Sequence, residues 1–184
     1  MHLYGNEKIL VLRLSSLGDI LLTTPLIKLI KLKYPGTEID FLLKSAYSKA
    51  IENNPYIKDV LYYESDNLIE ILKSKDYRYV IDLQNNLRSR KLTGQLSSEI
   101  MRFKKPWFRK FTLVQTGINL YEEIIPVPLM YCRTAGIEPE DLPAPEIFIP
   151  ANINVSVEKD SGTILLCPGS RHFTKMWPKE YFIE

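Results

Sequence analysis

Three short loops hold the side chains of this sequence that are best suited to chemistry. The first runs from Arg13 to Asp19 and reads Arg-Leu-Ser-Ser-Leu-Gly-Asp. Its small residues, Ser15, Ser16 and Gly18, let the backbone come close to a ligand. Asp19 is a carboxylate that can take a proton from a substrate hydroxyl as a general base. The alternative is that Asp19 is only an acid in the first turn of a helix, where the helix dipole stabilises it.

The second loop runs from Asp82 to Ser89 and contains Asn85, Asn86 and Arg88. Two amides followed by a guanidinium at a helix start can hydrogen-bond a sugar or hold an anion. Asn and Ser are also common in turns and helix caps, so turn formation is an equal alternative for this loop.

The third loop, from Pro168 to Pro178, contains Ser170, Thr174 and Lys175. A glycine turn with hydroxyls and a lysine just before a helix N-terminus suits a phosphate or a diphosphate. The alternative is a solvated lysine, which is the usual state of such a residue near a helix start.

Several common kinds of site are absent from the sequence. The first loop has neither the Gly-Lys-Ser/Thr of a P-loop nor the Gly-x-Gly-x-x-Gly of a dinucleotide site, which argues against a nucleotide triphosphatase or a dehydrogenase. The chain has two histidines and two cysteines. Cys132 and Cys167 are far apart in sequence, so we expect neither a zinc site nor a disulfide framework, but two reduced, mostly buried thiols.

The elements that must position these loops alternate between strand and helix. Short apolar runs typical of buried strands lie at 8–14, 38–43, 60–63, 79–83 and 100–103. Helical spacing lies at 18–34, 46–53, 68–75, 88–96 and 128–136, with Pro25 either kinking the first helix or marking a late start. This alternation predicts an α/β, Rossmann-like fold, a parallel sheet flanked by helices. Ligands of such sheets bind beyond the carboxyl ends of the strands, where the loops lie.

We expect two domains, residues 1–150 and residues 151–184. Residues 139–150 carry four prolines and predict an extended linker. The later segment offers one strand, one loop and the start of a helix, which is too little to bury a core of its own. It therefore either packs on the first domain or begins a second domain whose remainder is absent from these residues.

Composition narrows the class of protein. Of 184 residues, 45% are hydrophobic and the net charge is +2, which argues against a dedicated nucleic-acid binder. There is no apolar run of about 18 residues and no signal peptide, so we expect a cytoplasmic protein. Residues 102–111 interleave basic and aromatic side chains, and this segment either meets an anionic substrate or a lipid surface, or forms a solvated loop packed on the sheet.

Three segments, taken in their order along the chain, resemble motifs of the ADP-heptose:lipopolysaccharide heptosyltransferase family. They are residues 9–20 with Thr24-Pro25, residues 79–84 with Arg88-Ser89, and residues 167–170 with 174–178. The resemblance implies the N-terminal half of a GT-B fold, followed by the start of the second Rossmann-like domain. In that family the N-terminal half takes the acceptor and the C-terminal half binds the nucleotide sugar.

The resemblance also assigns roles to residues. Asp19 matches the general base, which would deprotonate an acceptor hydroxyl for inverting attack. Lys175 matches the lysine on the donor phosphates, with Ser170 and Thr174 as neighbouring contacts. The first two loops would bind the acceptor through Ser15, Ser16, Gly18, Asn85, Asn86 and Arg88. The family needs no metal or other cofactor, because cations and helix N-termini stabilise the leaving diphosphate.

These features together predict transfer of a heptose, or a related sugar, from an ADP-sugar to the anionic core of lipopolysaccharide. The expected partners are that donor and that acceptor, with peripheral contact at the cytoplasmic face of the inner membrane and no nucleic acid. Without the rest of the donor half, we expect these residues alone to show no useful turnover. The alternative from another class is a non-catalytic Rossmann-like binding or assembly module that needs a partner chain.

Overall fold

The computed structural model describes residues 5–105, 107–118, 123–150, 170 and 176–182. The chain divides into two compact units, Met1–Pro150 and Ala151–Glu184. In the second unit the described residues include a short 3-10 helix, η3 (Lys179–Phe182). Cys167, and the strand expected before it, lie outside the described residues.

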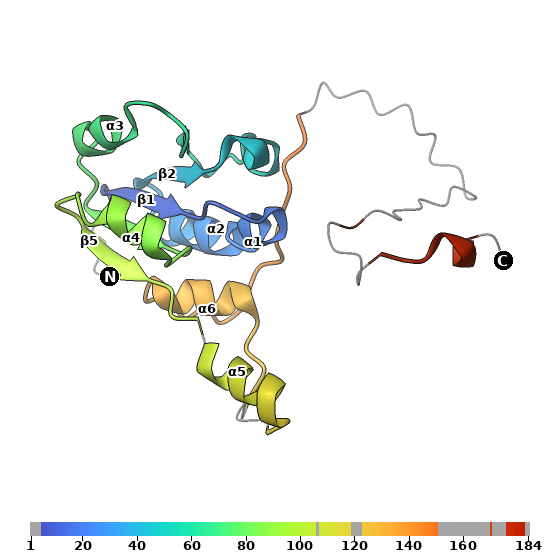
Figure 1. Cartoon of the computed structure of the whole chain (residues 1–184). Coiled ribbons are helices and arrows are strands. Elements are labelled where there is room, and N and C mark those ends of the chain that lie inside the picture. Colours follow the sequence, from blue (N-terminus) through green and yellow to red (C-terminus); the bar gives the residue numbers. More distant parts are fainter. Residues whose placement is uncertain (1–4, 106, 119–122, 151–169, 171–175, 183–184) are drawn as a thin grey trace. The chain divides into compact units, whose positions relative to one another are not determined.

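The first unit is built on a five-stranded parallel sheet with the order β3-β2-β1-β4-β5 (Figure 1). The strands are β1 (Lys8–Leu12), β2 (Glu38–Leu43), β3 (Asp59–Tyr62), β4 (Tyr79–Asp82) and β5 (Glu99–Arg102). The predicted Rossmann-like α/β fold is thereby confirmed. Strand β1 lies in the centre and pairs Leu12 with Leu42 of β2 and with Asp82 of β4.

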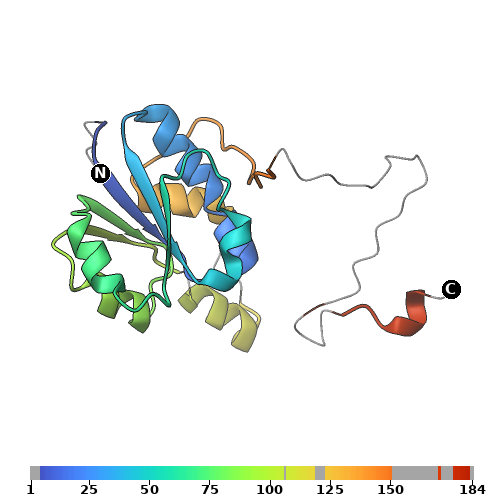
Figure 2. The same cartoon turned by 90° about the horizontal axis from the view of Figure 1, so that it is seen from above.

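Both faces of the sheet are buried, which explains the continuous apolar runs of the strands. Alternate residues of β1 enter opposite cores: Ile9 and Val11 pack on one face, and Leu10 and Leu12 on the other. Helices α2 (Thr24–Lys33) and α6 (Val127–Thr134) contribute to the first core. Helices α3 (Leu68–Ser74) and α4 (Leu87–Thr93) cover the second face (Figure 2).

The helix expected at 18–34 is in fact two helices, α1 (Leu17–Leu21) and α2. Pro25 lies in the first turn of α2, so the late start is the correct alternative. Pro25 has no N–H to give to the carbonyl of Leu21, and the hydroxyl of Thr24 donates to that carbonyl instead, at 2.8 Å. The break therefore leaves no orphaned carbonyl at this point.

Three further segments complete the first unit. Residues 46–53, expected to be α-helical, contain the 3-10 helix η1 (Ser45–Ala50), and residues 107–116, which had no assignment, form helix α5 (Trp107–Thr116). The expected linker is irregular but docked on α2, where Lys28 Nζ donates to Glu146 Oε1 at 2.5 Å and the Glu146 N–H donates to Thr24 Oγ1 at 2.9 Å.

Candidate active site

The loops after β1 and β4 are neighbours at the carboxyl edge of the sheet. The chain leaves β1 toward β2 and β3 on one side, then crosses to β4 and β5 on the other, so the strand order reverses between β1 and β4. Such a reversal opens a crevice beyond the strand ends, which is the usual place for a ligand in this kind of sheet. The first two loops singled out from the sequence therefore share one site.

Arg13 ties the two loops together. Its side chain is buried, and Nη1 donates to the carbonyl of Leu83 at 2.6 Å while Nε donates to the carbonyl of Ser15 at 2.8 Å. From the other loop, Gln84 Oε1 accepts a hydrogen bond from the Leu14 N–H at 3.1 Å. A buried guanidinium is costly unless its donors are satisfied, and here the two loops satisfy them.

The third Arg13 nitrogen, Nη2, forms an ion pair with Asp19 Oδ2 at 2.7 Å. The same oxygen accepts from the Ser16 N–H at 3.1 Å and from the Ser16 hydroxyl at 3.0 Å. The Asp19 side chain is still 37% exposed. Its other oxygen, Oδ1, accepts no hydrogen bond among the described residues, so one face of the carboxylate remains open to a substrate hydroxyl.

The surroundings of Asp19 set its charge. Partial burial works to raise the pKa of this carboxyl, but the Ser16 backbone N–H, the Arg13 guanidinium and the Ser16 hydroxyl outweigh it. The pKa of Asp19 consequently lies below its ordinary value of 3.8. Asp19 is therefore ionised at neutral pH, which a general base requires. The lowered pKa also makes it a weaker base than an ordinary aspartate.

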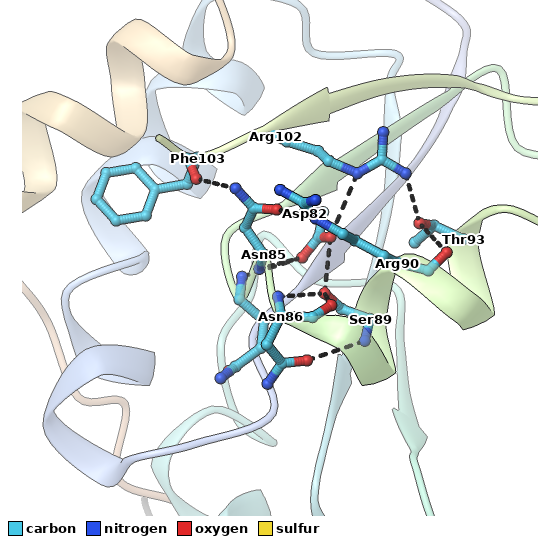
Figure 3. A network of polar contacts seen from close by, with 9 residues as sticks. Asp82, Asn85, Asn86, Ser89, Arg90, Thr93, Arg102 and Phe103 are labelled. Carbon is cyan, nitrogen blue, oxygen red and sulfur yellow. Dashed lines mark hydrogen bonds and ion pairs between the residues drawn. The ribbon is translucent and has the colours of Figure 1, made fainter. Parts of the chain in front are cut away.

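A second carboxylate, Asp82, organises the loop after β4 (Figure 3). Asp82 is fully buried, and its Oδ1 accepts from the N–H groups of Gln84 and Asn85 at 3.1 and 2.8 Å. Its Oδ2 accepts from the Ser89 hydroxyl at 2.8 Å and lies 3.8 Å from Arg102 Nε. These contacts fold the loop back over the end of β4 and fix its shape.

The two asparagines of this loop are engaged by the protein itself. Asn85 has a φ of +43°, donates to the Phe103 carbonyl at 2.6 Å and accepts from Arg90 Nε at 2.8 Å. Asn86 caps α4 by accepting from the Ser89 N–H at 3.0 Å (Figure 3). These contacts favour turn formation and capping for the two amides, while the neighbouring Arg88 side chain is exposed.

Two side chains from later in the chain are coupled by charge to Arg13 and Asp19. Lys105, just after β5, is exposed, and its pKa is lowered first by partial desolvation and then by the nearby Arg13, while Asp19 and Asp82 act in the opposite direction. Tyr131 of α6 is buried, and burial raises its pKa while Arg13 works against that rise. The Asp19 carboxylate thus acts electrostatically on the Lys105 cation, without a direct contact among the described residues.

The placement of the predicted site residues follows from these contacts. The structure brings the first two loops together, and with them Ser15, Ser16, Gly18, Asp19, Asn85, Asn86 and Arg88. A Cβ built on Gly18 meets no atom within 4 Å, so the space beside this backbone is open. Of the predicted donor-phosphate residues, Ser170 is half-buried in the second unit, and Thr174 and Lys175 lie outside the described residues.

The sequence alone predicted no role for Arg13 or Asp82, and for Lys105 only the role shared by the whole segment 102–111. Arg13 carries a signal that could have found it, because a charged residue that directly continues a buried strand needs partners there. Lys105 belongs to the basic and aromatic segment, but nothing in its spacing places it beside Asp19. In the part of the chain that the structure describes, no group of three or more His, Cys, Asp or Glu residues could hold a metal ion.

Comparison with known proteins relates this fold to glycosyltransferases. A glycosyl transferase of family 9 from Veillonella parvula matches 78% of this chain with 20% identity and a TM-score of 0.63. The ADP-heptose LPS heptosyltransferase II of E. coli matches 78% with 16% identity and a TM-score of 0.58. The E. coli heptosyltransferase WaaC, solved with ADP, matches 73% with 17% identity and a TM-score of 0.56.

The chain spans about half the length of these structures, covering 45%, 47% and 49% of them respectively. At such low identity the likeness shows the fold, a Rossmann-like α/β unit corresponding to part of a GT-B structure. The resemblance to heptosyltransferases expected from the three sequence motifs is confirmed at this level. No protein-family model matches the chain, and no curated protein matches it in sequence.

Proposed function

We propose that these residues form the acceptor-binding half of an inverting, metal-independent glycosyltransferase of the heptosyltransferase kind, followed by the start of its donor half. The observation that carries the proposal is the carboxylate of Asp19, ionised and half open at the crevice between β1 and β4. The fold shared with four structures of three glycosyltransferases supports it, and two of these, both of E. coli WaaC, hold ADP or an ADP-sugar analogue.

In the proposed reaction, an acceptor hydroxyl donates its hydrogen bond to Asp19 Oδ1. As its oxygen attacks the anomeric carbon of the donor sugar, the proton passes to Asp19 and the bond from that carbon to the diphosphate breaks. The low pKa of Asp19 fits a late proton transfer, because the hydroxyl becomes strongly acidic only as the new bond forms. Arg13 then stabilises the carboxylate again after the proton is released.

The leaving group is the nucleoside diphosphate, and Lys175 is the residue we propose to neutralise it, with Ser170 and Thr174 as hydrogen-bond donors. A hydrogen-bonded cation at the departing phosphates lowers the barrier because it meets charge that grows during the reaction. The donor is proposed to be an ADP-sugar, with heptose or a related sugar as the transferred group.

The acceptor is proposed to be anionic, such as the inner core of lipopolysaccharide. Lys105 lies close enough to Asp19 and Arg13 to feel both charges, and Arg88 is exposed on the neighbouring loop. A lysine coupled to the Asp19 carboxylate, together with an exposed arginine at the start of α4, favours a substrate that brings its own negative groups. We place the reaction in the cytoplasm, in peripheral contact with the inner membrane. In the described residues, no helix is long and apolar enough to cross a membrane.

One observation favours the second candidate, a binding or assembly module without catalysis. Three donors converge on Oδ2 of Asp19, which is also how a purely structural carboxylate would hold the first turn of α1 together. In that case the open Oδ1 has no chemical role, and removal of its charge changes stability but not turnover.

Measuring turnover of Asp19→Asn in the full-length natural polypeptide separates the two candidates. The transferase proposal expects turnover to fall on the order of a hundredfold or more, with donor affinity nearly unchanged. Asp66→Asn is the matched control, since Asp66 is an exposed acid on another part of the surface. If Asp19→Asn turns over as fast as Asp66→Asn does, Asp19 has no part in the mechanism.

A further inference from the structure

Helix α5 carries an apolar surface that faces outward. It stands away from the sheet, beyond α6 (Figure 1). Val114 is 67% exposed and Ile118, just after the helix, is 57% exposed. Phe111 and Leu113 are also exposed large hydrophobic side chains. Single exposed apolar residues are normal on a soluble protein, but Phe111 and Val114, three positions apart, share one face of α5, and Ile118 follows just beyond the helix, which makes an apolar patch that calls for an occupant.

The charge around this patch has one sign. Between residues 100 and 121 there is no acidic residue, and the segment contains Arg102, Lys104, Lys105, Arg109 and Lys110. Five of the chain's 24 lysines and arginines fall here, so the remainder holds fewer basic residues than its 22 acidic ones. The segment is therefore a local basic region on an otherwise acidic chain.

A hollow of about 390 Å³ lies at the foot of α5, by which we mean the space between the residues that lead into this helix and helix α6. Its walls include the apolar side chains of Phe103, Ile125 and Met130, and Lys104 lies at its edge. The other two cations of the wall are already engaged, Arg102 with Asp82 and Thr93, and Arg133 with Glu138. Lys104 has no hydrogen bond or ion pair among the described residues, so its charge is available to a partner.

We propose that α5, with Lys104, Lys105 and the hollow at its foot, is a docking surface for the anionic face of a lipid bilayer. The apolar side chains around Val114 enter the boundary between headgroups and acyl chains, and the cations meet lipid phosphates. The positive charge of this surface favours an anionic bilayer over a second copy of the chain. Two copies would bring two basic segments together, whereas an anionic bilayer complements both the apolar and the charged part of the surface.

This inference stands on the surface of α5 and does not depend on the transferase proposal. It is compatible with that proposal, because Lys105 joins this surface to the neighbourhood of Asp19. A protein docked through α5 would hold the candidate active site close to the membrane, where an acceptor anchored in lipid is concentrated.

Co-sedimentation with vesicles tests the inference without any sugar donor, so its result is independent of transfer activity. The full chain is mixed with vesicles of phosphatidylcholine alone, or of phosphatidylcholine with phosphatidylglycerol, at low and high salt. We expect binding to the mixed vesicles, little binding to phosphatidylcholine, and a loss of binding at high salt. Val114→Glu should lower partitioning about tenfold, since it puts a charge into the inserted face.

Leu32→Glu is the matched control, because Leu32 is 62% exposed on α2, away from this surface. It should partition like the natural sequence, and circular dichroism should show both variants folded. Equal partitioning of the two variants, or no preference for the anionic vesicles, would overturn the inference. So would self-association in the absence of vesicles that Val114→Glu abolishes, because the occupant would then be a second copy.

Discussion

The two ends of the parallel sheet each hold a carboxylate paired with a cation, but they differ in access. At the carboxyl end, Asp19 pairs with Arg13 and is 37% exposed. At the amino end, Asp40 is 4% exposed, and its Oδ2 accepts from Lys75 Nζ at 2.7 Å and from the Tyr77 hydroxyl at 2.6 Å. The cavity beside Asp40 has a volume of about 40 Å³, room for little more than water.

An ion pair does not by itself make a binding site. Asp40 has a buried oxygen, Oδ1, without a partner among the described residues, yet no substrate can reach it. Asp19 keeps an oxygen that a solute can reach, at the edge of the sheet where loops from two strands meet. We therefore propose that chemistry takes place at the carboxyl end and that the ion pair at the amino end serves structural stabilisation. Three substitutions and one pH titration test this division.

The largest effect on stability is expected at Arg13. Arg13→Met removes the bridge between the loops after β1 and β4 and leaves the carbonyls of Ser15 and Leu83 without their donor. We expect a loss of about 3 kcal/mol, the lower part of the range for breaking a buried pair, since Asp19 can still be solvated. Urea unfolding measures it, and Arg88→Met, at an exposed arginine, should change stability far less. Equal losses would contradict the bridging role.

The next largest effect is expected at Asp40. Asp40→Asn keeps an acceptor for the Tyr77 hydroxyl but removes the negative charge of Asp40. Asp40 is one of the two carboxylates, with Asp59, that Lys75 Nζ contacts. We expect a loss of about 1 to 2 kcal/mol in unfolding free energy. Turnover per folded molecule should stay unchanged, unlike in Asp19→Asn. A fall in turnover that exceeds the loss of folded protein would break the division between the two ends.

A smaller effect of opposite sign is expected at Gly18. A Cβ there meets no atom within 4 Å, so Gly18→Ala should stabilise α1 by about 0.5 to 1 kcal/mol through helix propensity. The same methyl group fills space that we assign to the acceptor, so acceptor binding should weaken. Thermal unfolding and acceptor titration together test this. A variant that is more stable and binds the acceptor equally well would remove Gly18 from the site.

The smallest effect is the pH dependence that Asp19 gives to stability. Its pKa in the folded chain lies below the ordinary value of 3.8, so its stabilisation is present above that value and is lost as the pH falls through the folded pKa. The difference in stability between the natural sequence and Asp19→Asn should thus be constant near neutral pH and shrink on acidification below 3.8. A difference that grows on acidification has the wrong sign for this account.

Much of the fold could be predicted from the sequence. The branched apolar run of β1 and the alternation of strands with helices follow from local patterns and identify a parallel sheet. The break between α1 and α2 is also local, because Pro25 restricts where a helix can begin. The 3-10 form of η1 was not predicted, since its spacing over six residues does not separate the two kinds of helix.

The candidate site was predicted only in part, for reasons of distance in sequence. The loops that carry Asp19 and Asn85 could be placed at one edge, because both follow strands of a parallel sheet. The bridge from Arg13 to Leu83 spans 70 positions, and the charge of Lys105 reaches Asp19 from beyond β5. Such contacts arise from packing: a local pattern can indicate that Arg13 needs partners, but it does not identify them.

The central claim is that the carboxyl end of the sheet, and not the amino end, receives the substrate. The most direct test is to follow the side-chain carboxyl carbons of Asp19 and Asp40 in one NMR spectrum while a lipopolysaccharide inner-core saccharide is added. We expect the Asp19 signal to shift with saturation and the Asp40 signal to stay in place, because only Asp19 is open to a solute. An unmoved Asp19 signal, or equal shifts of both signals, would contradict the account.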